Sequence, residues 1–131
     1  MRYDKTKIEW IVRRIIDAVN HNRYTISKIN RQKNEEFRAK HGINTEQRLK
    51  DILLQLTVDN FSCIAKNVNP GYEEEQLYIF GPQVQVYRAG EDTATDVIMY
   101  IKVSIIERNI DDFIVVISFH EAEKVIRYAF K

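Results

Sequence analysis

The sequence predicts an α+β fold, in which helices from the first part of the chain pack on one face of a largely antiparallel sheet formed by the second part. Apolar residues recur at helical spacing up to about Thr57, and from Phe61 onward they tend to alternate, as is typical of strands. The 131 residues are 44% hydrophobic and 30% charged, which suffices for one core without disulfides or metals. We therefore expect a single domain over residues 1–131.

A first helix is expected from about Thr6 to Asn20. Thr6, followed three residues later by Glu9, has the spacing of a capping box, which satisfies backbone groups at a helix start. Trp10 lies beside the apolar stripe and is expected to flank the core. The stripe has helical spacing and consists of Ile8, Ile11, Val12, Ile15, Ile16 and Val19.

Three shorter elements follow this helix. Residues 24–26 have the composition of a short edge strand, and residues 35–40 predict a short helix that Gly42 ends. A third helix with a narrow apolar stripe is expected from Asn44 or Thr45 to about Thr57.

Three strands are expected at residues 61–65, 76–80 and 83–88. The loop between the first two contains Asn-Pro-Gly and three consecutive glutamates, which indicates a solvated turn. Gly81-Pro82 separates the second strand from the third, because proline cannot donate to a sheet ladder.

The clearest pattern is a hairpin of residues 97–106 and 113–120, joined by a polar turn. The even-numbered side chains of both strands should share the outer face, because side chains alternate across a strand. The odd-numbered positions are apolar and are expected to face the core together: Val97, Met99, Ile101, Val103, Ile105, Phe113, Val115, Ile117 and Phe119.

The pairing of this hairpin predicts a cluster of polar residues. The count along the strands starts with Glu107 opposite Phe113. It places Tyr100 opposite His120, with Lys102 nearby on the same face. A slip of two residues would change the partners but not the face.

Charge and cysteine content limit the classes of function. The 20 basic and 19 acidic residues give a formal net charge of +1, so any contact with RNA must be local. Cys63 is the single cysteine, which excludes an internal disulfide and favours a reducing compartment, by default the cytoplasm. No stretch has the pattern of a signal peptide or a membrane span, so neither secretion nor membrane insertion is expected.

Three segments, taken in order, resemble the MqsR toxins: FRAKHGI at 37–43 leading to LLQLTVDNF at 53–61, then YIKV at 100–103, then VVISFH at 115–120. The resemblance implies a RelE-like fold and a toxin that cuts single-stranded messenger RNA without a metal or other cofactor. It also implies an antitoxin protein as partner. Residues 121–131 extend past the matching part and are expected to form a helix or a strand.

The resemblance also indicates site residues. Tyr100 matches the family's active-site tyrosine, and His120 occupies the place of a lysine after the Ser-Phe pair. A second family lysine aligns nearest Cys63, with Lys66 just beyond it, and the family's glutamine has no clean match. Cys63 itself is expected to be a small, buried or half-buried residue, because the sequence places no histidine beside it.

Cleavage of RNA without a metal needs a base for the 2′-hydroxyl proton, groups that stabilise the phosphate, and an acid for the leaving oxygen. We expect His120 to be the general acid or base and Tyr100 to orient the phosphate or donate to it. Lys102, together with Lys66 or Arg88, would stabilise the phosphate charge.

Other interpretations of these residues remain open. A tyrosine, a lysine and a histidine on the solvent side of a hairpin occur in many one-sided sheets. The chain could be a non-catalytic protein- or RNA-binding module on the same fold, for instance a phage-derived or regulatory one, or an unrelated α+β domain. Strand alternation separates His120 from Glu121, so no metal site is expected. His21 and His41 are expected to be exposed loop residues.

Overall fold

The structure, a computed structural model, describes residues 3–27, 31–41, 43, 45–68, 70–87, 90 and 93–131. It has an α+β architecture, as predicted. Within the described residues no helix is long and apolar enough to cross a lipid bilayer. The helices are α1 (Lys5–Asn20), α2 (Arg31–Lys40), α3 (Glu46–Leu53) and the short 3-10 helix η1 (Val58–Asn60). The strands are β1 (Tyr24–Ile26), β2 (Phe61–Lys66), β3 (Gln76–Phe80), β4 (Gln83–Tyr87), β5 (Ala94–Glu107) and β6 (Asp112–Glu121).

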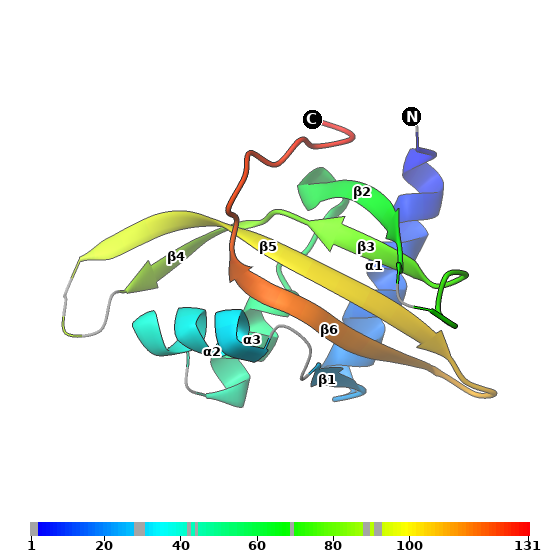
Figure 1. The fold of residues 1–131 in the computed structure, drawn as a ribbon, viewed down its shortest axis with the longest axis horizontal. Coiled ribbons are helices and arrows are strands. Elements are labelled where there is room, and N and C mark those ends of the chain that lie inside the picture. The colour runs from blue at the N-terminus through cyan, green and yellow to red at the C-terminus, as the bar shows by residue number, and fades with distance from the viewer. Residues whose placement is uncertain are drawn as a thin grey trace.

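The strands form one mixed sheet in the order β1-β6-β5-β3-β2, and β4 pairs with the first half of β5. β1 runs parallel to β6, and the other pairs are antiparallel, so the sheet is largely antiparallel as expected. Figure 1 shows α1 crossing behind the sheet, with α2 and α3 beside β6. Apolar side chains of these helices and of one sheet face form a single core, and the opposite face, here called the outer face, lies away from the helices.

Helix α1 begins one residue earlier than the sequence predicts. The carboxylate of Asp4 caps it, with Oδ1 accepting from the backbone N–H groups of Thr6 at 3.0 Å and Lys7 at 3.4 Å. The expected capping box at Thr6 is therefore wrong. Trp10 is also not a core residue, because 54% of its surface is exposed and its ring packs 4.6 Å from the guanidinium of Arg14.

A β-bulge in β6 changes which residues of this strand face the core, so part of the predicted core set is wrong. Val103 pairs with Val116 and Lys102 pairs with Ser118, which leaves Ile117 as an extra residue. The extra residue reverses the alternation, so Val116 is fully buried in the core. Between the turn and the bulge, the predicted core residues Phe113, Val115 and Ile117 are instead only half-buried.

Several other boundaries differ from the sequence prediction. α2 starts at Arg31 rather than Glu35, and α3 ends at Leu53 rather than near Thr57. His41 is buried rather than exposed, with its ring 4.7 Å from that of Phe37. Gly42, the expected helix stop, and Asn44 lie outside the described residues.

Residues 122–131, here called the crossing segment, form neither the expected helix nor a strand. Figure 1 shows this segment running from the end of β6 past β5 and β3 toward β2, at the top of the view.

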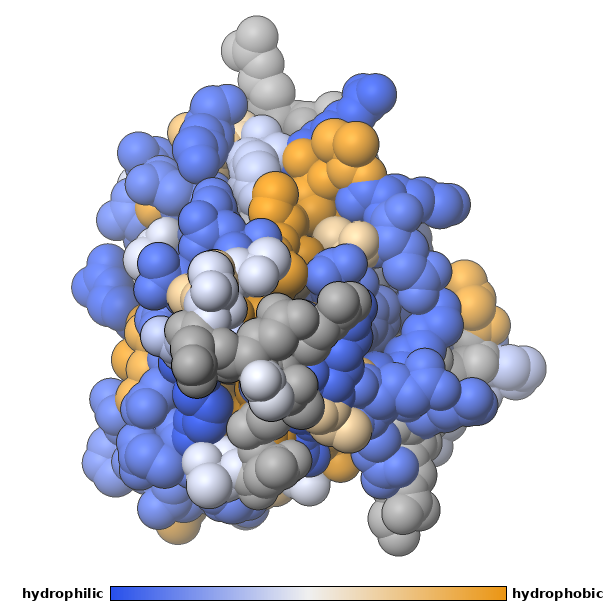
Figure 2. Space-filling model, turned by 90° about the vertical axis from the view of Figure 1, so that its left-hand side faces the viewer, coloured by the Kyte–Doolittle hydropathy of each residue, from blue (hydrophilic) through white to orange (hydrophobic). Residues whose placement is uncertain are grey.

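Figure 2 looks at the left end of the molecule and shows hydrophilic residues over most of it, with hydrophobic residues gathered toward the top.

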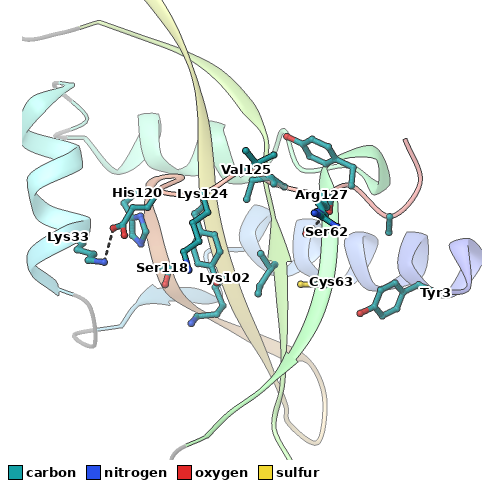
Figure 3. Close-up of a pocket in the computed structure, with 16 residues that line it drawn as sticks. Tyr3, Lys33, Ser62, Cys63, Lys102, Ser118, His120, Lys124, Val125 and Arg127 are labelled. Atoms are coloured by element: carbon teal, nitrogen blue, oxygen red, sulfur yellow. Dashed lines mark hydrogen bonds and ion pairs between the residues drawn. The ribbon is translucent and has the colours of Figure 1, made fainter. Parts of the chain in front are cut away.

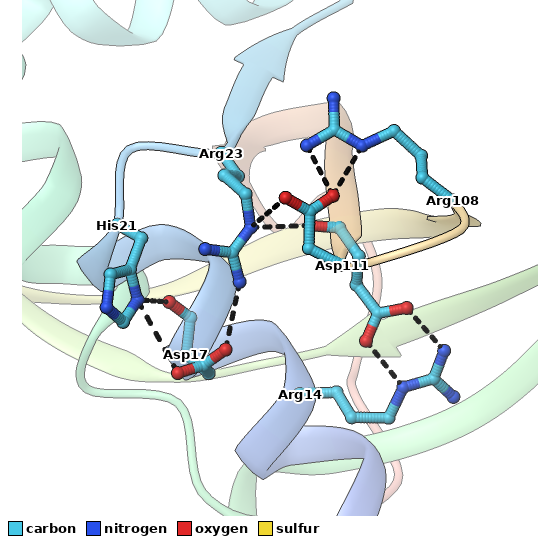
Figure 4. A network of polar contacts seen from close by, with 7 residues as sticks. Arg14, Asp17, His21, Arg23, Arg108 and Asp111 are labelled. Atoms are coloured by element: carbon cyan, nitrogen blue, oxygen red, sulfur yellow. Dashed lines mark hydrogen bonds and ion pairs between the residues drawn. The ribbon is translucent and has the colours of Figure 1, made fainter.

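A network of ion pairs ties α1 to the turn between β5 and β6 (Figure 4). Nε and Nη2 of Arg14 each donate to the carboxylate of Asp112 at 2.9 Å. Arg23 donates from Nη2 to Asp17 at 2.9 Å and from Nε to the carbonyl of Asp112 at 3.0 Å. Nη2 of Arg108 forms an ion pair with Oδ1 of Asp111 at 2.6 Å. The two-pronged contact of Arg14 with Asp112 is the most sheltered pair, with side chains 16% and 24% exposed.

Replacing Asp112 with asparagine should make the protein less stable at neutral pH and flatten its response to acid. Hydrogen bonds from Arg14 hold the pKa of Asp112 below its ordinary value of 3.8. A lowered folded-state pKa contributes stability that is present above the unfolded value and is lost as pH falls through the folded one. We expect Asp112→Asn to cost about 1–2 kcal/mol at pH 7 and to remove the part of the loss between about pH 5 and 2 that comes from the protonation of Asp112. Urea unfolding at several pH values measures this, and equal pH slopes in Asp112→Asn and the exposed control Asp59→Asn would contradict it.

Candidate functional site

A pocket of about 810 Å³ lies on the outer face of the sheet. Its floor comes from β2, β3, β5 and β6, and one wall comes from the crossing segment. Tyr3 and Lys33 complete its rim. Figure 3 shows how side chains from these distant parts of the chain surround the same space.

Tyr100 and His120 are neighbours on the floor of this pocket, which confirms the predicted pairing. Their rings stack with centroids 5.6 Å apart and planes 21° apart. The expected starting pair is wrong, because Glu107 lies opposite Asp112 rather than Phe113. The bulge adds one residue to β6 before the site, and this shift restores the register that the sequence count assumed.

The hydrogen bonding of His120 defines the role of each ring nitrogen. Nδ1 lies 2.9 Å from the carbonyl oxygen of Glu121. A carbonyl oxygen only accepts, so Nδ1 carries the hydrogen and Nε2 of the neutral ring is left with a lone pair. The ring can therefore accept a proton at Nε2, and it lines the pocket.

Tyr100 is suited to donate a hydrogen bond rather than to act as a base. Burial raises its pKa above 10.0, and the nearby Cys63 adds to the rise. The phenol therefore keeps its proton at neutral pH. Lys102 completes the group, with Nζ 5.9 Å from the centroid of the Tyr100 ring.

Cys63 belongs to the same site, and it occupies the position that the resemblance aligns nearest a family lysine. A row of paired residues crosses the sheet from Cys63 through Ile79 and Lys102 to Ser118. All four line the pocket, and Cys63 is half-buried as expected. Its proximity depends on strand order, which the spacing of residues along the chain does not contain.

The pocket is locally basic in a chain whose formal net charge is only +1. Among the described residues that line it are four cationic side chains, Lys33, Lys102, Lys124 and Arg127, and one carboxylate, Glu123. Lys33 and Glu123 neutralise each other at 2.7 Å. Within the described part of the chain, the other three cations form no ion pair with a carboxylate, so their charge is available to an anion.

One of the expected phosphate contacts, Lys66, is not found in the pocket. Lys66 is exposed at the end of β2 and does not line the pocket. By strand alternation it shares the side of Ile64, which packs against the core, rather than that of Cys63. Arg88 lies outside the described residues. Lys33, Lys124 and Arg127 occupy the rim instead, and no motif in the sequence singled them out.

The described part of the loop between β2 and β3, which carries the three consecutive glutamates, does not line the pocket. None of the three consecutive glutamates is among its lining residues. Glu75 accepts hydrogen bonds from Asn67, at 3.2 Å, and from Ser104. Over the described residues, no three His, Cys, Asp or Glu side chains come together in a metal-binding arrangement.

Comparisons of the chain with models of protein families, with curated proteins and with solved structures find no match.

Proposed function

We propose that this chain is a metal-independent endoribonuclease of the MqsR type with a RelE-like fold, which cuts single-stranded messenger RNA and is held inactive by an antitoxin protein. The observation that carries the proposal is the stacked pair of Tyr100 and His120 inside a locally basic pocket. Helices on one face of a largely antiparallel sheet, with the site on the other, also fit this class.

The chemistry follows from the roles of these groups. Nε2 of His120 takes the proton of a 2′-hydroxyl, and the resulting oxygen attacks the adjacent phosphorus. The bond to the 5′ oxygen breaks, that oxygen takes a proton from Lys102 or water, and a 2′,3′-cyclic phosphate remains. The phenol of Tyr100 donates to a phosphate oxygen while the Lys102 ammonium stabilises the charge that builds up there.

The test is to incubate the purified protein with a long unstructured RNA, with and without a chelator, and to identify the new ends by mass spectrometry. We expect cleavage that the chelator does not change, with 2′,3′-cyclic phosphate and 5′-hydroxyl ends. Binding of RNA without cleavage would reject the nuclease and favour a non-catalytic binding module. Cleavage that stops with chelator would also reject the proposed chemistry.

A further inference from the structure

The crossing segment is fixed to the sheet along most of its length. The backbone N–H of Ala122, its first residue, donates to the carbonyl of Ile98 at 2.9 Å. The N–H of Ala129 donates to the carbonyl of Phe61 at 3.0 Å. Between them, Ser62 Oγ donates to the carbonyl of Arg127 at 2.7 Å. These contacts hold the segment across the sheet.

Aromatic and aliphatic packing adds to these hydrogen bonds. The hydroxyl of Tyr128 donates to the carbonyl of Gly81 at 2.5 Å, and the ring of Phe130 stacks on Phe61 at 6.1 Å. Ile126 lies so close to Gly81 that a Cβ added there would meet Ile126 at 2.7 Å. Any larger residue at Gly81 would therefore force Ile126 to shift.

Lys124 and Arg127 are the cations that this segment brings to the pocket. The contact that anchors Arg127 uses its backbone carbonyl and does not involve its guanidinium. Lys102 reaches the same pocket from β5, on the floor of the sheet (Figure 3). The three pocket cations other than Lys33 thus come from two facing elements, which suits a backbone phosphate held between them.

We propose that the crossing segment is the phosphate-binding wall of the pocket, with Lys124 and Arg127 as its binding residues, and that it restricts the substrate to unpaired RNA. This inference rests on the proposed function, because it assigns the substrate-binding part of the same site. A volume of about 810 Å³ is that of a small-molecule site and admits one or two nucleotides. The stacked base pairs of a double helix cannot enter it, whereas unpaired nucleotides can.

The first experiment removes the two charges without touching the anchors. Lys124→Gln with Arg127→Gln is compared with a control that carries the same charge change on the exposed side of α1, Lys7→Gln with Arg13→Gln. Binding of a 2′-O-methyl oligonucleotide, which cannot be cleaved, is measured over a range of salt concentrations. Each phosphate contact to a single strand contributes about 0.7 to the slope of log affinity against log salt. We expect the slope to fall by about 1.4 in the pocket variant, and to fall by less in the control.

The second experiment moves the segment without changing any charge. Gly81→Ala should displace Ile126 and weaken binding of the same oligonucleotide, and adding Ile126→Ala should restore much of it by making room. Circular dichroism at the temperature of the binding assay confirms that each variant is folded, so a weaker affinity then reports the displaced segment. A hairpin with a fully paired stem of the same sequence should bind more weakly than the unpaired strand to the unaltered protein.

The outcomes separate this inference from the proposed function. An unchanged salt slope in the pocket variant, or no rescue by Ile126→Ala, would overturn the role of the segment even if the protein cleaves RNA. If the oligonucleotide binds, the segment variants weaken that binding as expected, and the protein does not cleave RNA, the role of the segment is supported and the nuclease is rejected. No binding to the unpaired strand would overturn both.

Discussion

Replacing His120 with alanine is expected to lower the rate of RNA cleavage by roughly 100- to 10,000-fold. This is the usual contribution of a general acid or base that moves a proton in the transition state. His120 is the histidine that lines the pocket, and its Nε2 is the nitrogen left to accept a proton. The loss should appear in kcat under single-turnover conditions, with little change in the affinity for a non-cleavable oligonucleotide.

The matched control is His21→Ala. His21 is an exposed histidine at the end of α1, with its side chain 62% exposed, and it is not among the residues that line the pocket. The His21→Ala variant should cleave RNA at the same rate as the unaltered protein. Equal rates in His120→Ala and His21→Ala would reject the assignment of His120.

Tyr100→Phe separates the hydroxyl from the ring. Phenylalanine can keep the stack on His120 but cannot donate to a phosphate oxygen. We expect cleavage to fall by roughly 100- to 1,000-fold, the range found when one donor to a developing charge is removed. Because burial keeps the phenol protonated, this loss should be similar at pH 6 and pH 8. A loss confined to high pH would instead point to a phenolate.

The pairing of Tyr100 with His120 was predictable because it depends on local patterns. Alternation places both residues on the face opposite the apolar positions, and a short polar turn sets the approximate register. A slip of two residues would keep the two rings on one face, but a slip of one would separate them, and the bulge in β6 offsets the one-residue error in the expected starting pair. The helix α1, the strands and the α+β class follow from the same kind of local periodicity.

The basic rim of the pocket was not predictable in this way. Lys33 comes from α2, whereas Lys124 and Arg127 come from a segment with no regular secondary structure. Their positions depend on contacts between residues far apart in the chain, such as that of Ser62 with Arg127. Periodicity carries no information on such contacts, so these residues looked like any other surface cations.

The bulge in β6 was unpredictable for a similar reason, because Asn34, from a distant part of the chain, bonds to the backbone beside it. Its amide reaches from α2 to the part of β6 that follows the residues paired with β1, where Nδ2 donates to the carbonyl of Ile117 at 3.2 Å and Oδ1 accepts from the N–H of Phe119 at 2.8 Å. Asn34 is only 1% exposed. An amide can donate and accept at once, so it satisfies the two backbone groups on either side of Ser118.

Asn34→Ala is therefore expected to lower the free energy of unfolding by about 2–4 kcal/mol. The substitution leaves the N–H of Phe119 and the carbonyl of Ile117 without this partner, and each buried group left unpaired costs about 1–3 kcal/mol. Urea unfolding monitored by circular dichroism measures the change. Asn109→Ala, in the exposed turn between β5 and β6, is the control and should change it by less than about 0.5 kcal/mol.

The same substitution should also affect the site, because the bulge decides which side chains of β6 face the pocket. Without the amide of Asn34, the segment that carries Ser118 and His120 loses the contact that fixes its edge. Ile8→Val, a core change in α1 far from β6 in sequence, should cost about 0.5–1.5 kcal/mol and leave cleavage unchanged under conditions where the protein is folded. We expect Asn34→Ala to reduce cleavage under the same conditions. If it lost stability but cleaved as fast as Ile8→Val, the bulge would serve the fold alone and the geometry of His120 would not depend on it.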